Sequence, residues 1–142
     1  MWFVFGLEKQ AAAVGGKVHL ILGNHELMVM HADLRFLNPK YLYTQGTLRT
    51  VYPQFFNTST VLGQWLRSKP VCLTINESAF VHGGFSKEVL EKTESLSMIN
   101  QVFRETLYDG TPGEDLRLYK TYYILIMDHF GIADMQIQMV LM

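Results

Sequence analysis

The stretch "HLILGNHELMVMHADLR", His19–Arg35, changes its pattern of apolar residues at Gly-Asn-His-Glu. Before that point "VHLIL" is apolar at nearly every position, which is typical of a strand buried on both faces of a parallel or mixed sheet. After it, apolar residues recur three and four positions apart, which predicts a helix over residues 25–37. The sequence therefore predicts a strand-to-helix turn with Asn24 and His25 at its tip.

The composition indicates one globular domain, residues 1–142. Hydrophobic residues make up 49% of the chain and charged residues 18%, which suits a packed interior. The 12 Lys and Arg residues are scattered and balanced by 13 acidic ones, so we expect no nucleic-acid partner. We see no run long enough for a membrane span or a signal peptide, and we expect no membrane partner and a cytoplasmic location.

Cys72 is the sole cysteine, so no disulfide can form within the chain. It lies in the apolar run "VCLTI", which predicts a small buried side chain and not a reactive thiol.

The remaining pattern alternates helices with strands, which predicts an α/β or α+β layered fold. A hairpin is expected within residues 71–84, with its turn at Asn76-Glu77. The other predicted elements are a strand at 18–22, a strand at 135–141, and helices at 2–14, 58–69, 86–93, 95–108 and 119–131.

Two polar clusters follow predicted strands. Asn24 and His25 follow the first strand, and His82 follows the second strand of the hairpin in "AFVHGG". Strand ends in α/β sheets bind ligands, and an amide oxygen beside imidazoles suits a metal-assisted acid–base site. From the residues alone the alternative stays open that both clusters merely close turns.

The motifs "LILGNHE" and "FVHGG" resemble those of the calcineurin-like metallophosphoesterases, in which they form part of a two-metal centre. The longer stretch "GNHELMVMHADLRFL" resembles the branch known as Shewanella-like protein phosphatases. The resemblance implies part of a metallophosphoesterase β-sandwich flanked by helices. It also implies a phosphorylated protein or a small phosphoester as the substrate, with Ser/Thr and Tyr phosphatase activity both open.

The resemblance implies a role for each matched residue. Asn24 would bind one metal through its amide oxygen, His82 would bind the same metal, and His25 would protonate the leaving oxygen. Arg35 would lie near the phosphate, with a solvated arginine on the helix face as the alternative. The implied cofactors are two divalent ions, Mn, Fe or Zn.

Other parts of the family pattern are not found. The motifs Asp-x-His and Gly-Asp-x-x-Asp-Arg have no counterpart, since no Asp precedes Gly23, and no Gly-His-Thr follows "DHFG". We therefore expect an incomplete two-metal site in a partial domain, and whether the chain alone is an enzyme stays open. The alternative is an inactive remnant or binding module that associates through an open sheet edge.

The three remaining histidines are predicted to be structural. His19 is expected to be packed or hydrogen-bonded, and His129 to end a helix, where the helix dipole favours it. His31 is expected on the helix after the motif, solvated or, as the alternative, at the rim of a pocket.

Overall fold

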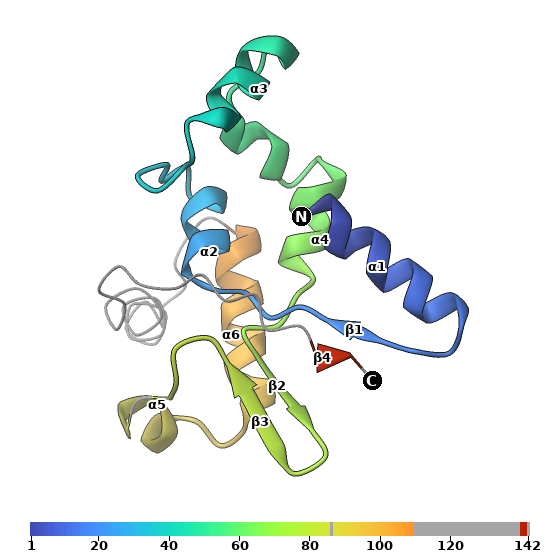
Figure 1. Cartoon of the computed structure of the whole chain (residues 1–142). Coiled ribbons are helices and arrows are strands. Elements are labelled where there is room, and N and C mark those ends of the chain that lie inside the picture. Colours follow the sequence, from blue (N-terminus) through green and yellow to red (C-terminus); the bar gives the residue numbers. More distant parts are fainter. Residues whose placement is uncertain (86, 110–139, 142) are drawn as a thin grey trace.

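The computed structural model describes residues 1–85, 87–109 and 140–141. Figure 1 shows α1 and α3 at the periphery, and α6 beside a small hairpin. In chain order the elements are α1 Trp2–Ala13, β1 Val18–His19, α2 Asn24–Met30, α3 Lys40–Leu48, the 3-10 helix η1 Tyr52–Phe56, α4 Val61–Arg67, β2 Cys72–Ile75, β3 Ser78–Val81, α5 Lys87–Lys92, α6 Leu96–Asp109 and β4 Val140–Leu141.

The described strands form two separate antiparallel pairs, β1 with β4 and β2 with β3. The hairpin is confirmed, and its turn contains Asn76 with a φ of 53°. Asparagine tolerates this left-handed conformation better than most residues do.

The prediction of a strand over 18–22 in a parallel or mixed sheet is wrong for the described residues. Only Val18–His19 are in a strand, and their partner β4 runs antiparallel. Further along, the Leu22 N–H donates to the Pro70 carbonyl at 2.9 Å. The backbone N–H of Leu22 is therefore bonded to the segment before β2 and is not part of a strand ladder.

Helix α2 is shorter than the predicted helix over 25–37, because the chain turns at Ala32 with a φ of 61°. The Asp33 N–H donates to the Met28 carbonyl at 2.8 Å, and the Ala32 N–H donates to the Val29 carbonyl at 3.1 Å. This pair of bonds is the Schellman ending of a helix. The apolar spacing continues past it, but the helix does not.

The other predicted helices are confirmed where the structure describes them. Thr60 caps α4 by accepting a hydrogen bond from the Gly63 N–H at 3.1 Å. The sequence interpretation missed α3 and η1. The predictions for residues 110–139, among them the helix at 119–131 and His129, lie outside the described residues.

One hydrophobic core joins the helices to the hairpin. Its fully buried side chains come from the segment before α2, α2 itself, α4, β2 and α6 and include Leu22, Leu27, Leu66, Cys72 and Phe103. Burial of these side chains is the main force that holds the elements together. The result is the predicted α/β class.

Helix α1 is attached to the end of α4 by Glu8. Its carboxylate accepts a hydrogen bond from Trp65 Nε1 at 2.7 Å and pairs with Lys69 Nζ at 2.7 Å. The Phe5 ring meets the Trp65 ring edge-to-face, with centroids 5.6 Å apart.

Arg67 is buried, with a relative exposure of 6%. Its guanidinium donates to the carbonyls of Phe56, at 2.6 Å, and Leu107, at 3.3 Å. A buried charge is costly unless it is well hydrogen-bonded, and here its bonds connect η1 and α6 to α4.

Asn100 of α6 replaces a neighbouring strand along part of β2. Its Oδ1 accepts from the Val71 N–H at 2.9 Å and the Cys72 N–H at 3.2 Å, and its Nδ2 donates to the Cys72 carbonyl at 2.8 Å. These bonds fix the hairpin against α6 and so fix the direction in which β3 delivers its last residue.

In the part of the chain that the structure describes, no helix is long and apolar enough to cross a membrane.

We predict that Asn100→Ala lowers the free energy of unfolding by about 2–3 kcal/mol, because it leaves buried backbone groups without partners. Urea denaturation measures the change. The control is Gln101→Ala on the exposed side of the same helix, where Gln101 bonds only to Glu105 in the described residues. We expect it to alter stability by less than about 0.5 kcal/mol. Equal effects of the two substitutions would contradict the proposed role of Asn100.

Candidate metal-binding and catalytic site

The two sequence motifs meet at Asn24 and His82. Asn24 is the first residue of α2, and His82 directly follows β3. The distance between Asn24 Oδ1 and His82 Nε2 is 3.2 Å, although the residues are 58 positions apart. The fold therefore brings together the amide and the imidazole that the motifs supply.

Gly23 allows this contact. Its backbone is extended, with φ −111° and ψ −176°, so the conformation does not require glycine. A Cβ at this position would, however, lie only 3.0 Å from the His82 ring. On the other side of the contact, Gly83 and Gly84 have φ values of 92° and 106°. Those values do favour glycine and let the chain turn away after His82.

The turn at Gly23 is also fixed by hydrogen bonds on either side. The Gly23 N–H donates to the Glu26 carboxylate at 3.0 Å, which satisfies one of the free donors at the start of α2. The Leu22–Pro70 bond links the preceding residue to the segment that leads into β2. Asn24 and His82 are thus positioned by backbone that is connected on both sides.

The donor atoms of Asn24 and His82 suit a shared divalent cation. Metal–ligand bonds of about 2.1 Å place two adjacent ligand atoms about 3 Å apart. The observed separation of 3.2 Å is close to that value. Two donors make an incomplete set, and no group of three His, Cys, Asp or Glu side chains that could hold a metal exists among the described residues.

His25 is the second residue of α2 and is half-buried. Its ring lies against Phe36, with centroids 5.6 Å apart and an interplanar angle of 55°. The sequence interpretation assigned Phe36 to the helix and gave it no role. Because α2 ends before Ala32, the chain reverses its direction there, and Phe36 lies beside the start of that helix.

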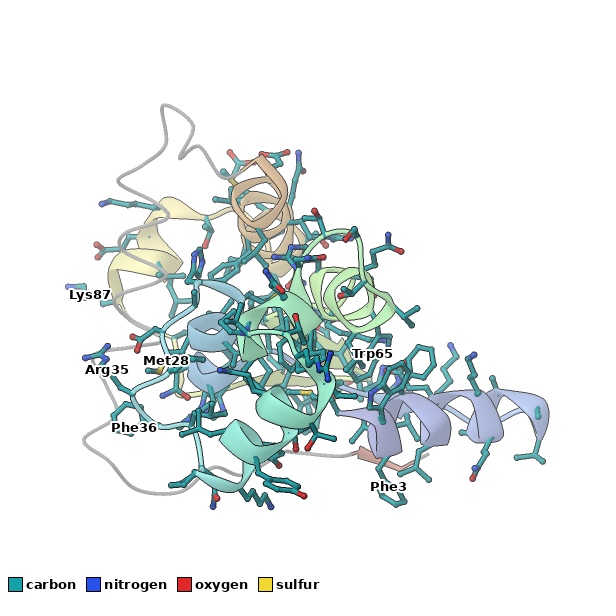
Figure 2. All side chains as sticks on the ribbon, turned by 90° about the horizontal axis from the view of Figure 1, so that it is seen from above. Phe3, Met28, Arg35, Phe36, Trp65 and Lys87 are labelled. Carbon is teal, nitrogen blue, oxygen red and sulfur yellow. The ribbon has the colours of Figure 1, made fainter. Side chains whose placement is uncertain are left out.

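Arg35 lies in the turn after α2 and not on the helix face, and its side chain is 71% exposed. Its Nε and Nη2 donate to the Asp33 carboxylate at 3.0 and 2.7 Å. The hydrogen bond from Arg35 lowers the pKa of Asp33 below its usual value. Figure 2 shows Arg35 and Phe36 on the side of the molecule away from Trp65.

The other candidate side chains lie outside this pair. His31 ends α2, and desolvation, followed by the charge of Arg67, lowers its pKa. The Nε2 atom of His19 is buried and makes no hydrogen bond within the described residues, which agrees with the packed ring that was one of the two predicted alternatives. Burial raises the pKa of Cys72 to about 11, so the thiol stays protonated, as its apolar setting predicts.

The arrangement defines an α/β domain with a candidate ligand site at the end of a strand and the start of a helix. Comparison with known proteins agrees with this class. The family model described as calcineurin-like phosphoesterase matches residues 2–138. The chain belongs to the calcineurin-like phosphoesterase family.

One relative and two solved structures show which phosphatases this chain resembles. Shewanella-like protein phosphatase 1 of Plasmodium berghei (strain Anka) is 30% identical over 88 residues, which are 59% of this chain and 24% of that protein. The solved cold-active protein tyrosine phosphatase shares 34% identity, with a TM-score of 0.73 over 92% of this chain and 37% of that one. A structure of the enzyme from a psychrophilic Shewanella species gives the same identity and TM-score over 38% of its chain. The chain thus spans between about a quarter and two fifths of the length of these proteins.

We predict that Gly23→Ala separates His82 from Asn24 and lowers the free energy of unfolding by about 1–3 kcal/mol, since the new methyl group meets a packed ring. Urea denaturation and the NMR signals of the His82 ring measure the two effects. The matched control is Gly46→Ala in α3, where a Cβ would meet nothing within 4 Å. We expect that control to be neutral or stabilising by up to about 1 kcal/mol. A Gly23→Ala protein with normal stability and unchanged His82 signals would contradict the account.

Proposed function

We propose that this chain takes part in metal-dependent hydrolysis of a phosphoester, with Asn24 and His82 as ligands of one divalent cation. The observation that carries the proposal is the 3.2 Å contact between two metal-ligand types supplied by separate motifs. Family membership supports a phosphoester as the substrate. The similar proteins, a protein phosphatase and protein tyrosine phosphatases, support a phosphorylated protein or a small phosphoester as that substrate.

Asn24 Oδ1 and His82 Nε2 are within hydrogen-bonding distance of each other. In the tautomer with a proton on Nε2, the imidazole of His82 donates to Asn24 Oδ1. Metal binding requires that nitrogen to be unprotonated, so a cation would take the place of the shared proton and move the ring proton to Nδ1.

Two bound divalent ions, Mn, Fe or Zn, would polarise the phosphoryl group and activate a water for attack. His25 adjoins Asn24 in sequence and would hold the proton that the leaving oxygen needs. Arg35 would assist by binding the phosphate, and its bonds to Asp33 orient the guanidinium through Nε and Nη2. No covalent nucleophile is needed for this chemistry, in keeping with the raised pKa of Cys72.

A complete two-metal centre needs more ligands than Asn24 and His82. Because no suitable cluster exists within 1–85, 87–109 and 140–141, further ligands would have to come from outside these residues. We therefore expect the isolated chain to bind metal weakly and to hydrolyse phosphoesters slowly in excess metal.

We predict that Asn24→Ala and His82→Ala each weaken Mn²⁺ binding by at least about tenfold and abolish chelator-sensitive hydrolysis of p-nitrophenyl phosphate. Calorimetric titration gives the affinity, and release of p-nitrophenol in excess Mn²⁺ gives the rate. The controls are Asn76→Gly in the hairpin turn and His31→Gln at the end of α2, which should behave as the unaltered chain. Circular dichroism verifies that every variant is folded.

Two outcomes would contradict the proposal. The first is Mn²⁺ binding and hydrolysis that survive both substitutions. The second is the absence of hydrolysis by the unaltered chain, together with self-association that increases with protein concentration. That second result would favour the binding-module alternative, in which the scaffold associates through a sheet edge.

A further inference from the structure

The turn after α2 brings an aromatic ring back to the start of that helix. Phe36 is eleven positions after His25, yet the two ring centroids are 5.6 Å apart. The Phe36 residue is 52% exposed and is not part of the hydrophobic core cluster. Its position is therefore not explained by burial in the core.

The segment that carries Phe36 is fixed by its own hydrogen bonds. The Schellman ending at Ala32 sets its direction, and the Asp33 carboxylate accepts bonds from both the backbone and the guanidinium of Arg35. The Leu37 N–H then donates to the Leu34 carbonyl at 2.9 Å. These hydrogen bonds stabilise the turn that places Phe36 beside α2.

We propose that Phe36 is a positioning residue for His25, an inference that rests on the proposed function. The ring of Phe36 restricts the rotamers open to the imidazole and covers one side of it. In the reaction, the oxygen of a water forms the new P–O bond while the bond from phosphorus to the leaving oxygen breaks, and the phosphate product carries the protons of that water. The His25 ring would give one N–H proton to the leaving oxygen, which departs as an alcohol. Such a transfer depends on the direction of the N–H, so the restricted ring favours it.

The dependence of rate on the leaving group distinguishes this role from a general structural one. The nitro group of p-nitrophenolate stabilises its negative charge, so it departs with little help from an acid. Phenolate needs the proton more. A misplaced His25 should therefore slow hydrolysis of phenyl phosphate more than hydrolysis of p-nitrophenyl phosphate, whereas partial unfolding would slow both equally.

We expect Phe36→Leu to reduce kcat for phenyl phosphate by about tenfold and for p-nitrophenyl phosphate by less than about twofold. Both esters are assayed with the 142-residue chain in excess Mn²⁺. Phe36→Tyr keeps the ring and should retain the activity of the unaltered chain. In a His25→Ala background, Phe36→Leu should have no further effect, because a residue that acts through His25 has nothing left to position.

NMR of the same variants tests the contact directly. The His25 ring protons should lose the ring-current shift from Phe36 in Phe36→Leu and keep it in Phe36→Tyr. Equal slowing of both esters, an additional loss in the His25→Ala background, or unchanged His25 signals would each overturn the inference alone. Absence of metal-dependent hydrolysis of either ester by the unaltered chain would overturn the proposed function, and the inference with it.

Discussion

The close approach of the His82 ring to the backbone of Gly23 is the constraint on which the site depends. The end of the hairpin and the start of α2 meet closely at position 23, where a Cβ would lie 3.0 Å from the His82 ring. That contact brings His82 Nε2 within 3.2 Å of Asn24 Oδ1. A larger residue would crowd the imidazole and push the His82 ring away from Asn24.

The rest of the described structure positions these two short segments. Asn100 fixes β2 to α6, and the pairing of β2 with β3 then determines where His82 emerges (Figure 1). The Leu22–Pro70 bond attaches the turn at Gly23 to the segment that leads into the same hairpin. Arg67 links α4 to η1 and α6 from inside the core. The polar site therefore rests on backbone held by the half-buried amide of Asn100 and the buried guanidinium of Arg67, in addition to apolar packing.

Local pattern predicted much of this arrangement. The hairpin, helices α4 and α6 and the burial of Cys72 follow from turn residues and periodicity. The polar residues at the strand end and the two strand-end motifs also identified Asn24, His25 and His82 as candidates. The sequence did not show where two of the elements end. Helix α2 ends at Met30, because the left-handed Ala32 and a Schellman pair override an apolar spacing that continues to Leu37. Strand β1 ends at His19, and Leu22 bonds to Pro70, which is distant in the sequence. The aromatic contact of Phe36 with His25 depends on that early helix end, so periodicity alone concealed it.

Pulsed electron paramagnetic resonance of Mn²⁺ added to the chain can show whether Asn24 and His82 bind one cation. The method detects the nitrogen of an imidazole bound to the metal. We expect a coupling to one histidine nitrogen that disappears in His82→Ala, disappears or weakens in Gly23→Ala, and persists in His31→Gln. A nitrogen coupling that survives in His82→Ala, or Mn²⁺ bound to the chain without any histidine nitrogen, would contradict it.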